Sequence, residues 1–255
     1  HPRASTSHHP PTSTKGPPVN TQPTQPTQPA ADPTHIYLLL DRSGSMSAIA
    51  GDVVGGFNQF LADQQRDGAD ARITIVQFDS QDPQEVIMAS APIREAMPLD
   101  SATYQPRGGT PLLDATGLLI GRAKVEAAAR AATGQPKEAI IFCTVTDGQE
   151  NQSSVYRREQ IQRLIAECES AGWKFVYLSA AFSAYADADD LGVHAGSTQA
   201  FMADGRGMRQ AWGSMSRNTV NYREKKRRLL AAELDPFFEA DKQAEEDLRR
   251  KQDPK

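Results

Sequence analysis

Three short segments of the sequence bring together side chains that end in hydroxyl or carboxylate oxygens. They read DRSGS at 41–45, GGTP at 108–111 and TDG at 146–148. Oxygen donors of this kind suit a hard divalent cation such as Mg²⁺, which keeps several of its waters when it binds to a protein. Two aspartates supply charge without saturating such an ion, and the hydroxyls are neutral. The ion would therefore stay electrophilic and keep a position open for an incoming carboxylate.

Each segment also has an ordinary structural explanation when it is taken alone. Asp41 and Ser43 can form side-chain turns, Thr110 can cap the helix that follows it, and an Asp-Gly pair is a common turn. All three segments, however, stand at the end of a predicted strand or helix. This shared placement favours one common site over three separate coincidences.

Two buried strands lead to the first and third segments. The apolar runs at 35–40 and 139–145 are typical of strands that are covered on both faces of a sheet. The first run ends at Asp41 and the second just before Asp147. Further strands are expected at 71–78, 85–89, 173–178 and, as a short one, Val193-His194; apolar spacing predicts helices within 49–61, 111–129, 161–168 and 208–219.

Strands that alternate with helices predict an α/β fold around a mostly parallel sheet. Only six residues, 79–84, separate two of the expected strands, and so short a link requires an antiparallel hairpin at one edge. Ligands of such sheets bind beyond the carboxyl ends of the strands, near the point where the strand order reverses. Asp41 and Asp147 both stand at such ends.

The composition divides the chain into three parts. Nine of the 17 prolines precede residue 35, so residues 1–34 are expected to form a disordered Pro/Thr/Gln-rich tail. Residues 35–220 form the expected domain, and residues 221–255, of which 19 are charged, a helical extension. The mildly negative charge of the middle part argues against nucleic-acid binding. No apolar stretch reaches the roughly 18 residues that a membrane span needs.

The motif residues resemble the von Willebrand factor A domain. The metal-ion-dependent adhesion site of that family has the pattern D-x-S-x-S, then T, then D, and the residues that fill it here are Asp41, Ser43, Ser45, Thr110 and Asp147. The resemblance covers about residues 35–220. The sequence TDGQEN at 146–151 is similar to the corresponding loop of compact bacterial stand-alone A domains.

The resemblance implies both a fold and a set of roles. The fold would be a doubly wound, mostly parallel six-stranded sheet in the order 3-2-1-4-5-6, with one antiparallel edge strand and helices on both faces. Ser43 and Ser45 would bind Mg²⁺ directly, Thr110 directly or through water, and Asp41 and Asp147 mainly through water. Mn²⁺ or Ca²⁺ are the alternative ions. A Glu or Asp of a protein ligand would take the remaining position.

Enzymatic functions fit the sequence less well, and we expect no catalytic activity. A phosphatase of the haloacid-dehalogenase type needs a second carboxylate where Ser43 stands. A serine hydrolase needs a histidine base, and the domain offers only His35, before or at the start of a predicted strand, and His194, far along the chain. The alternative function is a scaffold or regulatory subunit of a larger complex, for example with an ATPase, in which the metal site is only structural.

The two cysteines, Cys143 and Cys168, are too few for a disulfide framework or a cysteine-based zinc site. Their expected burial and the lack of a recognisable export signal favour a cytoplasmic protein. The Pro/Thr-rich tail would equally suit an extracellular stalk, so a secreted or cell-surface location stays open.

Overall fold

The structure is a computed structural model that describes residues 33–148, 150–228, 237–238 and 241–242. The tail predicted for 1–34 lies outside these residues except for its last two positions, and Thr34 begins the first strand. The strands are β1 (Thr34–Asp41), β2 (Ala71–Phe78), β3 (Glu85–Pro92), β4 (Ala139–Thr146), β5 (Lys174–Ser179) and β6 (Thr198–Ala200).

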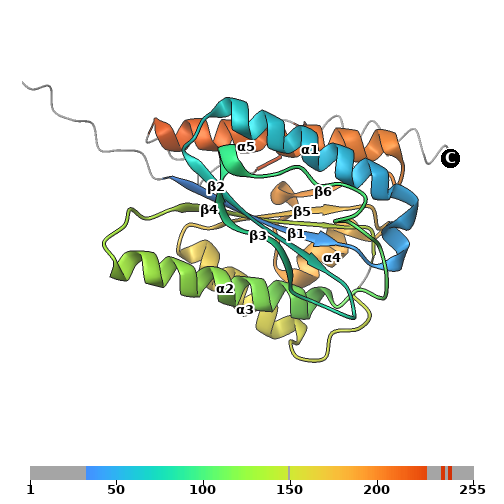
Figure 1. The fold of residues 1–255 in the computed structure, drawn as a ribbon. Helices are drawn as coiled ribbons and strands as arrows, with labels where there is room; N and C mark the ends of the chain where they lie inside the picture. Colours follow the sequence, from blue (N-terminus) through green and yellow to red (C-terminus); the bar gives the residue numbers. More distant parts are fainter. Residues whose placement is uncertain (1–32, 149, 229–236, 239–240, 243–255) are drawn as a thin grey trace, which may run out of the picture. The chain divides into compact units, whose positions relative to one another are not determined.

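The strands form one sheet in the order β3-β2-β1-β4-β5-β6 (Figure 1). Only β3 is antiparallel to its neighbour, and every other pair is parallel. Every residue of β1 and β4 is buried, as their continuous apolar runs predict. In the hairpin between β2 and β3, Asp79 Oδ1 accepts hydrogen bonds from the backbone N–H groups of Gln81 and Asp82, which turns the chain. The predicted fold class and strand order are confirmed.

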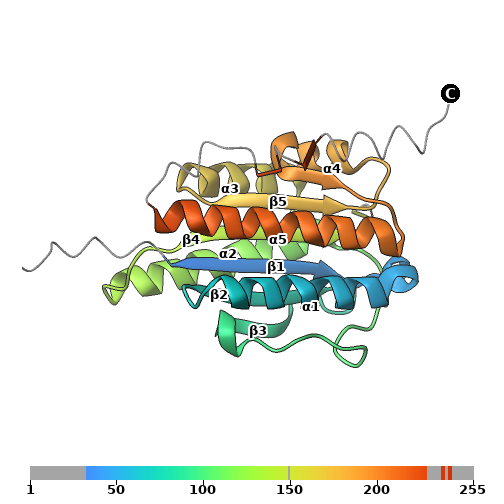
Figure 2. The ribbon, with the colours of Figure 1, turned by 90° about the horizontal axis from the view of Figure 1, so that it is seen from above.

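Helices cover both faces of the sheet (Figures 1 and 2). They are α1 (Ala50–Asp67), α2 (Leu112–Ala132), α3 (Arg158–Ser170), α4 (Ala184–Leu191) and α5 (Gly205–Arg227). One buried cluster joins the sheet to α1 and α5, and a second joins its other face to α2, α3 and α4. Alternate residues of the central strands serve the two clusters, which is why these strands are apolar throughout.

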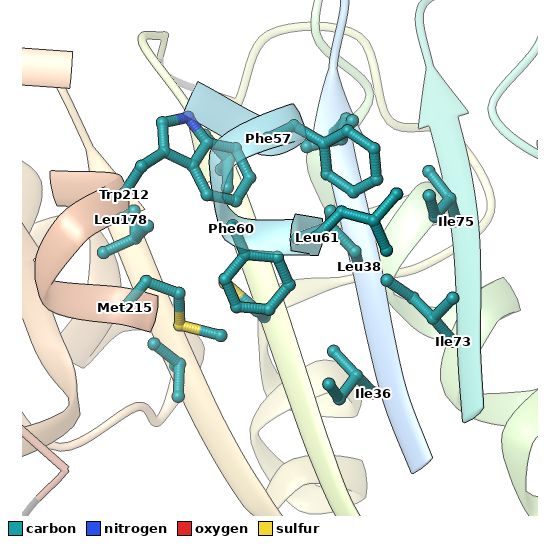
Figure 3. Close-up of a cluster of buried hydrophobic side chains, with 14 of the residues drawn as sticks. Ile36, Leu38, Phe57, Phe60, Leu61, Ile73, Ile75, Leu178, Trp212 and Met215 are labelled. Carbon is teal, nitrogen blue, oxygen red and sulfur yellow. The ribbon is translucent and has the colours of Figure 1, made fainter. Parts of the chain in front are cut away.

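The helices α1 and α5 pack closely against each other. Figure 3 shows Trp212 of α5 beside Phe57 and Phe60 of α1, with ring centroids 6.1 and 5.7 Å away. The approach depends on Gly56, because a Cβ atom there would lie 2.0 Å from Trp212 Cδ1. Near the other end of α5, the fully buried Arg223 donates to the backbone oxygen of Gln64 over 3.0 Å. The last helix is therefore fixed to α1 along its length.

Two features differ from the sequence-based expectations. The prediction of a short strand at Val193-His194 is wrong, because the sixth strand is β6, at Thr198–Ala200. Gly192 adopts a left-handed conformation (φ 88°) that ends α4, and Val193 donates its N–H to the oxygen of Ala188 and is buried against that helix. The apolar Val193 therefore packs at the end of helix α4 and does not belong to a strand.

The boundary predicted at 220/221 falls inside α5, which continues to Arg227. Beyond it, Phe237 and Phe238 are buried in the cluster between the sheet, α1 and α5. Asp241 accepts a hydrogen bond from Ser214 Oγ over 2.6 Å. The described part of the predicted extension therefore packs against the domain. Among the described residues, no helix combines the length and the apolar character needed to span a bilayer.

Candidate metal centre

The first and third motif segments meet because β1 and β4 are parallel neighbours. Their carboxyl ends lie at one end of the sheet, to which the arrowheads of β1 and β5 point in Figure 2. Asp41, the last residue of β1, is completely buried. Its Oδ2 accepts from Thr146 Oγ1 over 2.6 Å and its Oδ1 from the N–H of Ser43 over 2.7 Å. Asp41 is thus held in place by both segments.

The hydroxyls of the first segment connect it to Asp147. Ser45 Oγ donates to Asp147 Oδ1 over 2.7 Å, and Ser43 Oγ lies 3.1 Å from Ser45 Oγ. The bond between Ser45 and Asp147 spans 102 positions of sequence. Four of the five predicted residues therefore belong to one continuous set of hydrogen bonds.

The backbone of the second segment is attached to the first segment and to the loop that follows the third. The N–H of Gly44 donates to the oxygen of Gly108 over 3.0 Å. The N–H of Thr110 donates to Asn151 Oδ1 over 2.9 Å, and the N–H of Asn151 returns a bond to the oxygen of Thr110. Thr110 is thereby fixed between the first and third segments.

The glycine of TDG shows that the side chains converge on one space. A Cβ atom on Gly148 would lie 3.4 Å from Thr110 Oγ1, 3.6 Å from Ser45 Oγ and 4.0 Å from Asp41 Oδ2. Oxygens of the first and second segments therefore surround the position that this glycine, in the third segment, leaves without a side chain. The structure brings all five predicted residues together, and their role as metal ligands stays a prediction.

The electrostatics of the site suit a cation. Burial raises the pKa of Asp41 to about 6, and although bonds from Thr146 and Ser43 lower it, the nearby Asp147 raises it further. Burial also raises the pKa of Asp147. Both carboxylates are held by neutral hydroxyl and N–H groups, so a divalent ion would compensate their charge. The donors are all oxygens, which is the set that Mg²⁺ prefers.

A second layer of residues, which the sequence analysis missed, joins the first and second segments. Asp79, directly after β2, is buried and accepts from Arg42 Nε over 2.6 Å and from Arg107 Nε over 2.9 Å. Burial alone would raise the pKa of Asp79, but these arginines and two backbone N–H groups lower it below its ordinary value. Tyr104 donates to the backbone oxygen of Asp41 over 2.5 Å. The available signal was the position of Asp79 at the carboxyl end of the strand next to β1.

The loop after Asp147 caps α2. Glu150 Oε2 accepts from the N–H of Leu113 over 2.9 Å, and Ser153 Oγ accepts from the N–H of Asp114 over 3.0 Å. Asp114 in turn accepts from the backbone of residues 154–156. This loop therefore accepts the hydrogen bonds of backbone N–H groups in the first turn of α2. The cap expected from the Thr110 side chain is not formed.

The candidate site is built mainly from hydroxyls. Within the part of the chain that the structure describes, no group of three or more His, Cys, Asp or Glu side chains is placed to hold a metal ion. Only two of the five motif residues, Asp41 and Asp147, are of these types. A metal bound here would depend on Ser43, Ser45 and Thr110 for its other protein contacts.

Comparisons with known proteins inform the fold. No family model matches the chain, and no curated protein matches it. The pilus adhesin SpaC from Lactobacillus rhamnosus GG in its open conformation is similar over 76% of this chain and 30% of its own, at 13% identity and TM-score 0.54. Proximal thread matrix protein 1 from the mussel byssus, with a zinc-occupied MIDAS motif, is similar over 74% of this chain and 46% of its own, at 14% identity and TM-score 0.50.

The SpRpn10 VWA domain is similar over 70% of this chain and 93% of its own, at 13% identity and TM-score 0.47. The chain thus spans less than half of SpaC and of the mussel protein. At these identities the likeness concerns the fold alone. The observed strand order is the one that the resemblance to the von Willebrand factor A domain predicts, and the likeness to SpaC and to the mussel protein agrees with this fold.

Proposed function

We propose that this chain is a protein-binding module that depends on a divalent metal ion. The ion, Mg²⁺ with Mn²⁺ or Ca²⁺ as alternatives, is held by Asp41, Ser43, Ser45, Thr110 and Asp147. The observation that carries the proposal is the convergence of Thr110, Ser45 and Asp41 oxygens around Gly148. The zinc-occupied MIDAS motif of the mussel protein, which shares the fold, gives further support.

In this proposal the partner protein supplies a Glu or Asp that completes the coordination of the ion. The hydroxyls are neutral, so they position the ion without reducing its attraction for another carboxylate. Asp41 and Asp147 orient those hydroxyls and the waters of the ion. We propose no catalysis for the module itself. His35, which could serve as a histidine base, lies near the start of β1, at the opposite end of that strand from Asp41.

A pull-down from native lysate tests the proposal, with the full chain as bait in parallel with Mg²⁺ and with EDTA. We expect a partner that is retained only with Mg²⁺ and is lost with the Asp41→Asn variant. Asp190→Asn is the matched control, because it removes an exposed carboxylate on α4 that is paired with Arg158. A partner retained equally in EDTA would contradict the proposal.

The alternative function as a scaffold is tested by truncation, and the structure sets where the chain can be cut. A cut at 220 would remove the buried Arg223 and Phe238. A chain that ends after residue 242 keeps both, together with the bond between Asp241 and Ser214. Retention of the partner by this shorter chain supports the metal site, and loss of the partner supports a scaffold that acts through the last residues.

A further inference from the structure

The loops that follow β5 and β6 are apolar, in contrast to the rest of the site. Their first residues are Ala180, Ala181 and Phe182 after β5, and Phe201, Met202 and Ala203 after β6. We call these six residues the apolar rim. The N–H of Ala180 donates to the oxygen of Thr146, and the N–H of Phe201 donates to the oxygen of Ser179, each over 3.0 Å. The rim therefore begins beside the third motif segment and continues to the edge of the sheet.

The rim presents apolar surface to solvent. Phe182 is fully exposed, Phe201 and Met202 are half-buried, and Ala203 is exposed. Burial of the Phe182 side chain against a partner would be favourable, because it removes a large apolar surface from water. Phe201 packs against the cluster between the sheet, α1 and α5, so Phe182 is the large exposed apolar side chain of the rim. Isolated exposed apolar residues are common, and what sets Phe182 apart is its place in the loop after β5, beside the third motif segment. Phe182 is the member best placed to insert into a partner, since aromatic side chains supply much of the energy of protein interfaces.

The opposite side of the candidate site is polar. There the loops after β1 and β2 carry exposed Ser45, Ser47 and Ser80, and Arg107 is partly exposed. The strand order explains the asymmetry, because β2 lies on one side of the β1–β4 pair and β5 and β6 lie on the other. A ligand that reaches the ion would therefore meet the apolar rim on the β5–β6 side, and on the side of α2 the exposed Val155 of the loop after Asp147.

The rim and the candidate metal site are close enough for one partner to cover both. Ser179 pairs with Thr146 across β5 and β4, and Phe182 is three residues further along. Chain geometry therefore places Phe182 at most about 20 Å from Asp147. A standard protein interface of about 800 Å² per partner is about 30 Å across, so a single partner can cover both.

We infer that the apolar rim is a second docking element beside the candidate metal site. It receives an aliphatic or aromatic side chain from the same partner segment whose Glu or Asp reaches the ion. This inference rests on the proposed function and specifies the partner. The ligand is an acidic residue with an apolar neighbour on the β5–β6 side. An acidic residue among polar neighbours would bind through the ion alone and therefore more weakly.

A displayed peptide library tests the inference. Random 12-residue peptides with a fixed central Glu are bound to the full chain in Mg²⁺ and eluted with EDTA. We expect the eluted peptides to share a Leu, Ile or Phe at a constant distance from the Glu. The affinity of one such peptide is then measured by fluorescence anisotropy with wild type, Phe182→Ser and the matched control Val125→Ser, which changes an exposed apolar residue on α2.

Phe182→Ser should weaken the peptide at least tenfold, and Val125→Ser less than twofold. Changing the apolar residue of the peptide to Ser should weaken binding to wild type but scarcely to Phe182→Ser, because the two side chains act on each other. EDTA-eluted peptides without an apolar preference, or a Phe182→Ser affinity within twofold of wild type, would overturn the inference and leave the proposed function standing. If EDTA elutes no peptide, the proposed function fails and the inference fails with it.

Discussion

Among single residues, Gly148 connects the geometry of the site most directly to its chemistry. Its missing side chain leaves room between the oxygens of Asp41 and Ser45, from the first segment, and that of Thr110, from the loop before α2. The surrounding contacts are short and involve buried groups, so this room is set by the fold. A side chain added at Gly148 would compete with an ion for the same oxygens.

Gly148→Ala should weaken Mg²⁺ binding at least tenfold with little change in the stability of the metal-free protein. The added Cβ would stand 3.4 Å or more from its neighbours, which is an ordinary van der Waals distance. Calorimetric titration with Mg²⁺ and thermal unfolding in EDTA give the two quantities. The control is Gly121→Ala on α2, which meets nothing within 4 Å and should leave Mg²⁺ binding intact. Equal affinity of both variants would contradict the role given to Gly148.

The sequence predicts part of the site and leaves part of it out. Residue type, order and position at strand ends were sufficient to select the five candidates, which the structure brings together. Asp79 and Tyr104 were missed because their role depends on contacts with Arg42 and Asp41 that are distant in sequence. Such contacts are fixed by the packing of strands, which local patterns do not specify.

Among the secondary-structure elements, α5 and α1 form the tightest described contact between helices. Gly56 permits it, since Trp212 occupies the place of a side chain. The neighbouring Gly55 points into open space. An added side chain would therefore collide with Trp212 at Gly56 but would meet no neighbour at Gly55.

Gly56→Ala should lower the free energy of unfolding by about 1–3 kcal/mol, because overpacking displaces Trp212 or the helix. Gly55→Ala should raise it by up to about 1 kcal/mol, because alanine favours the helical backbone. Urea unfolding followed by circular dichroism measures both changes. Two variants that shift stability in the same direction would contradict this account of the α1–α5 contact.

The elements themselves were predictable to different degrees. The long apolar runs of β1 and β4 and the short link between β2 and β3 determine the centre and one edge of the sheet. The other edge strand, β6, has only the three residues Thr198–Ala200, two of them polar, and carries no apolar run to reveal it. Its place is set by pairing with β5.

Considered as a whole molecule, the protein has polar groups concentrated at both ends of its sheet. Opposite the candidate metal centre, Arg72 donates to both oxygens of Glu138 over 2.8 Å, and Arg130 Nε lies 3.0 Å from Glu138 Oε2. His35 Nδ1 lies 3.5 Å from the same carboxylate. Burial would raise the pKa of Glu138, but the bonds and charges of His35 and Arg72 outweigh it and lower the pKa to about 2.

This network should make stability depend on pH. The folded-state pKa of Glu138 lies below its ordinary value of about 4.5, so its contribution is complete above that pH and is lost as the pH falls towards 2. Glu138→Gln should therefore lower the free energy of unfolding by about 2–3 kcal/mol at pH 7, and the difference from wild type should shrink between pH 5 and pH 2. Urea titrations across this range measure it, with the exposed Glu159→Gln as control. A difference that stays constant with pH would contradict the assignment.

We propose above all that five side chains at the carboxyl end of the sheet bind a divalent ion. Isothermal titration of Mg²⁺ into EDTA-treated, dialysed wild type and Asp41→Asn tests it most directly. Asn keeps the size of the buried Asp41 side chain and removes its charge, so the variant should stay folded and lose at least a hundredfold in affinity. One ion bound per wild-type chain, with this loss in the variant, is the result that we predict. No binding to wild type, or equal binding to both proteins, would contradict the claim.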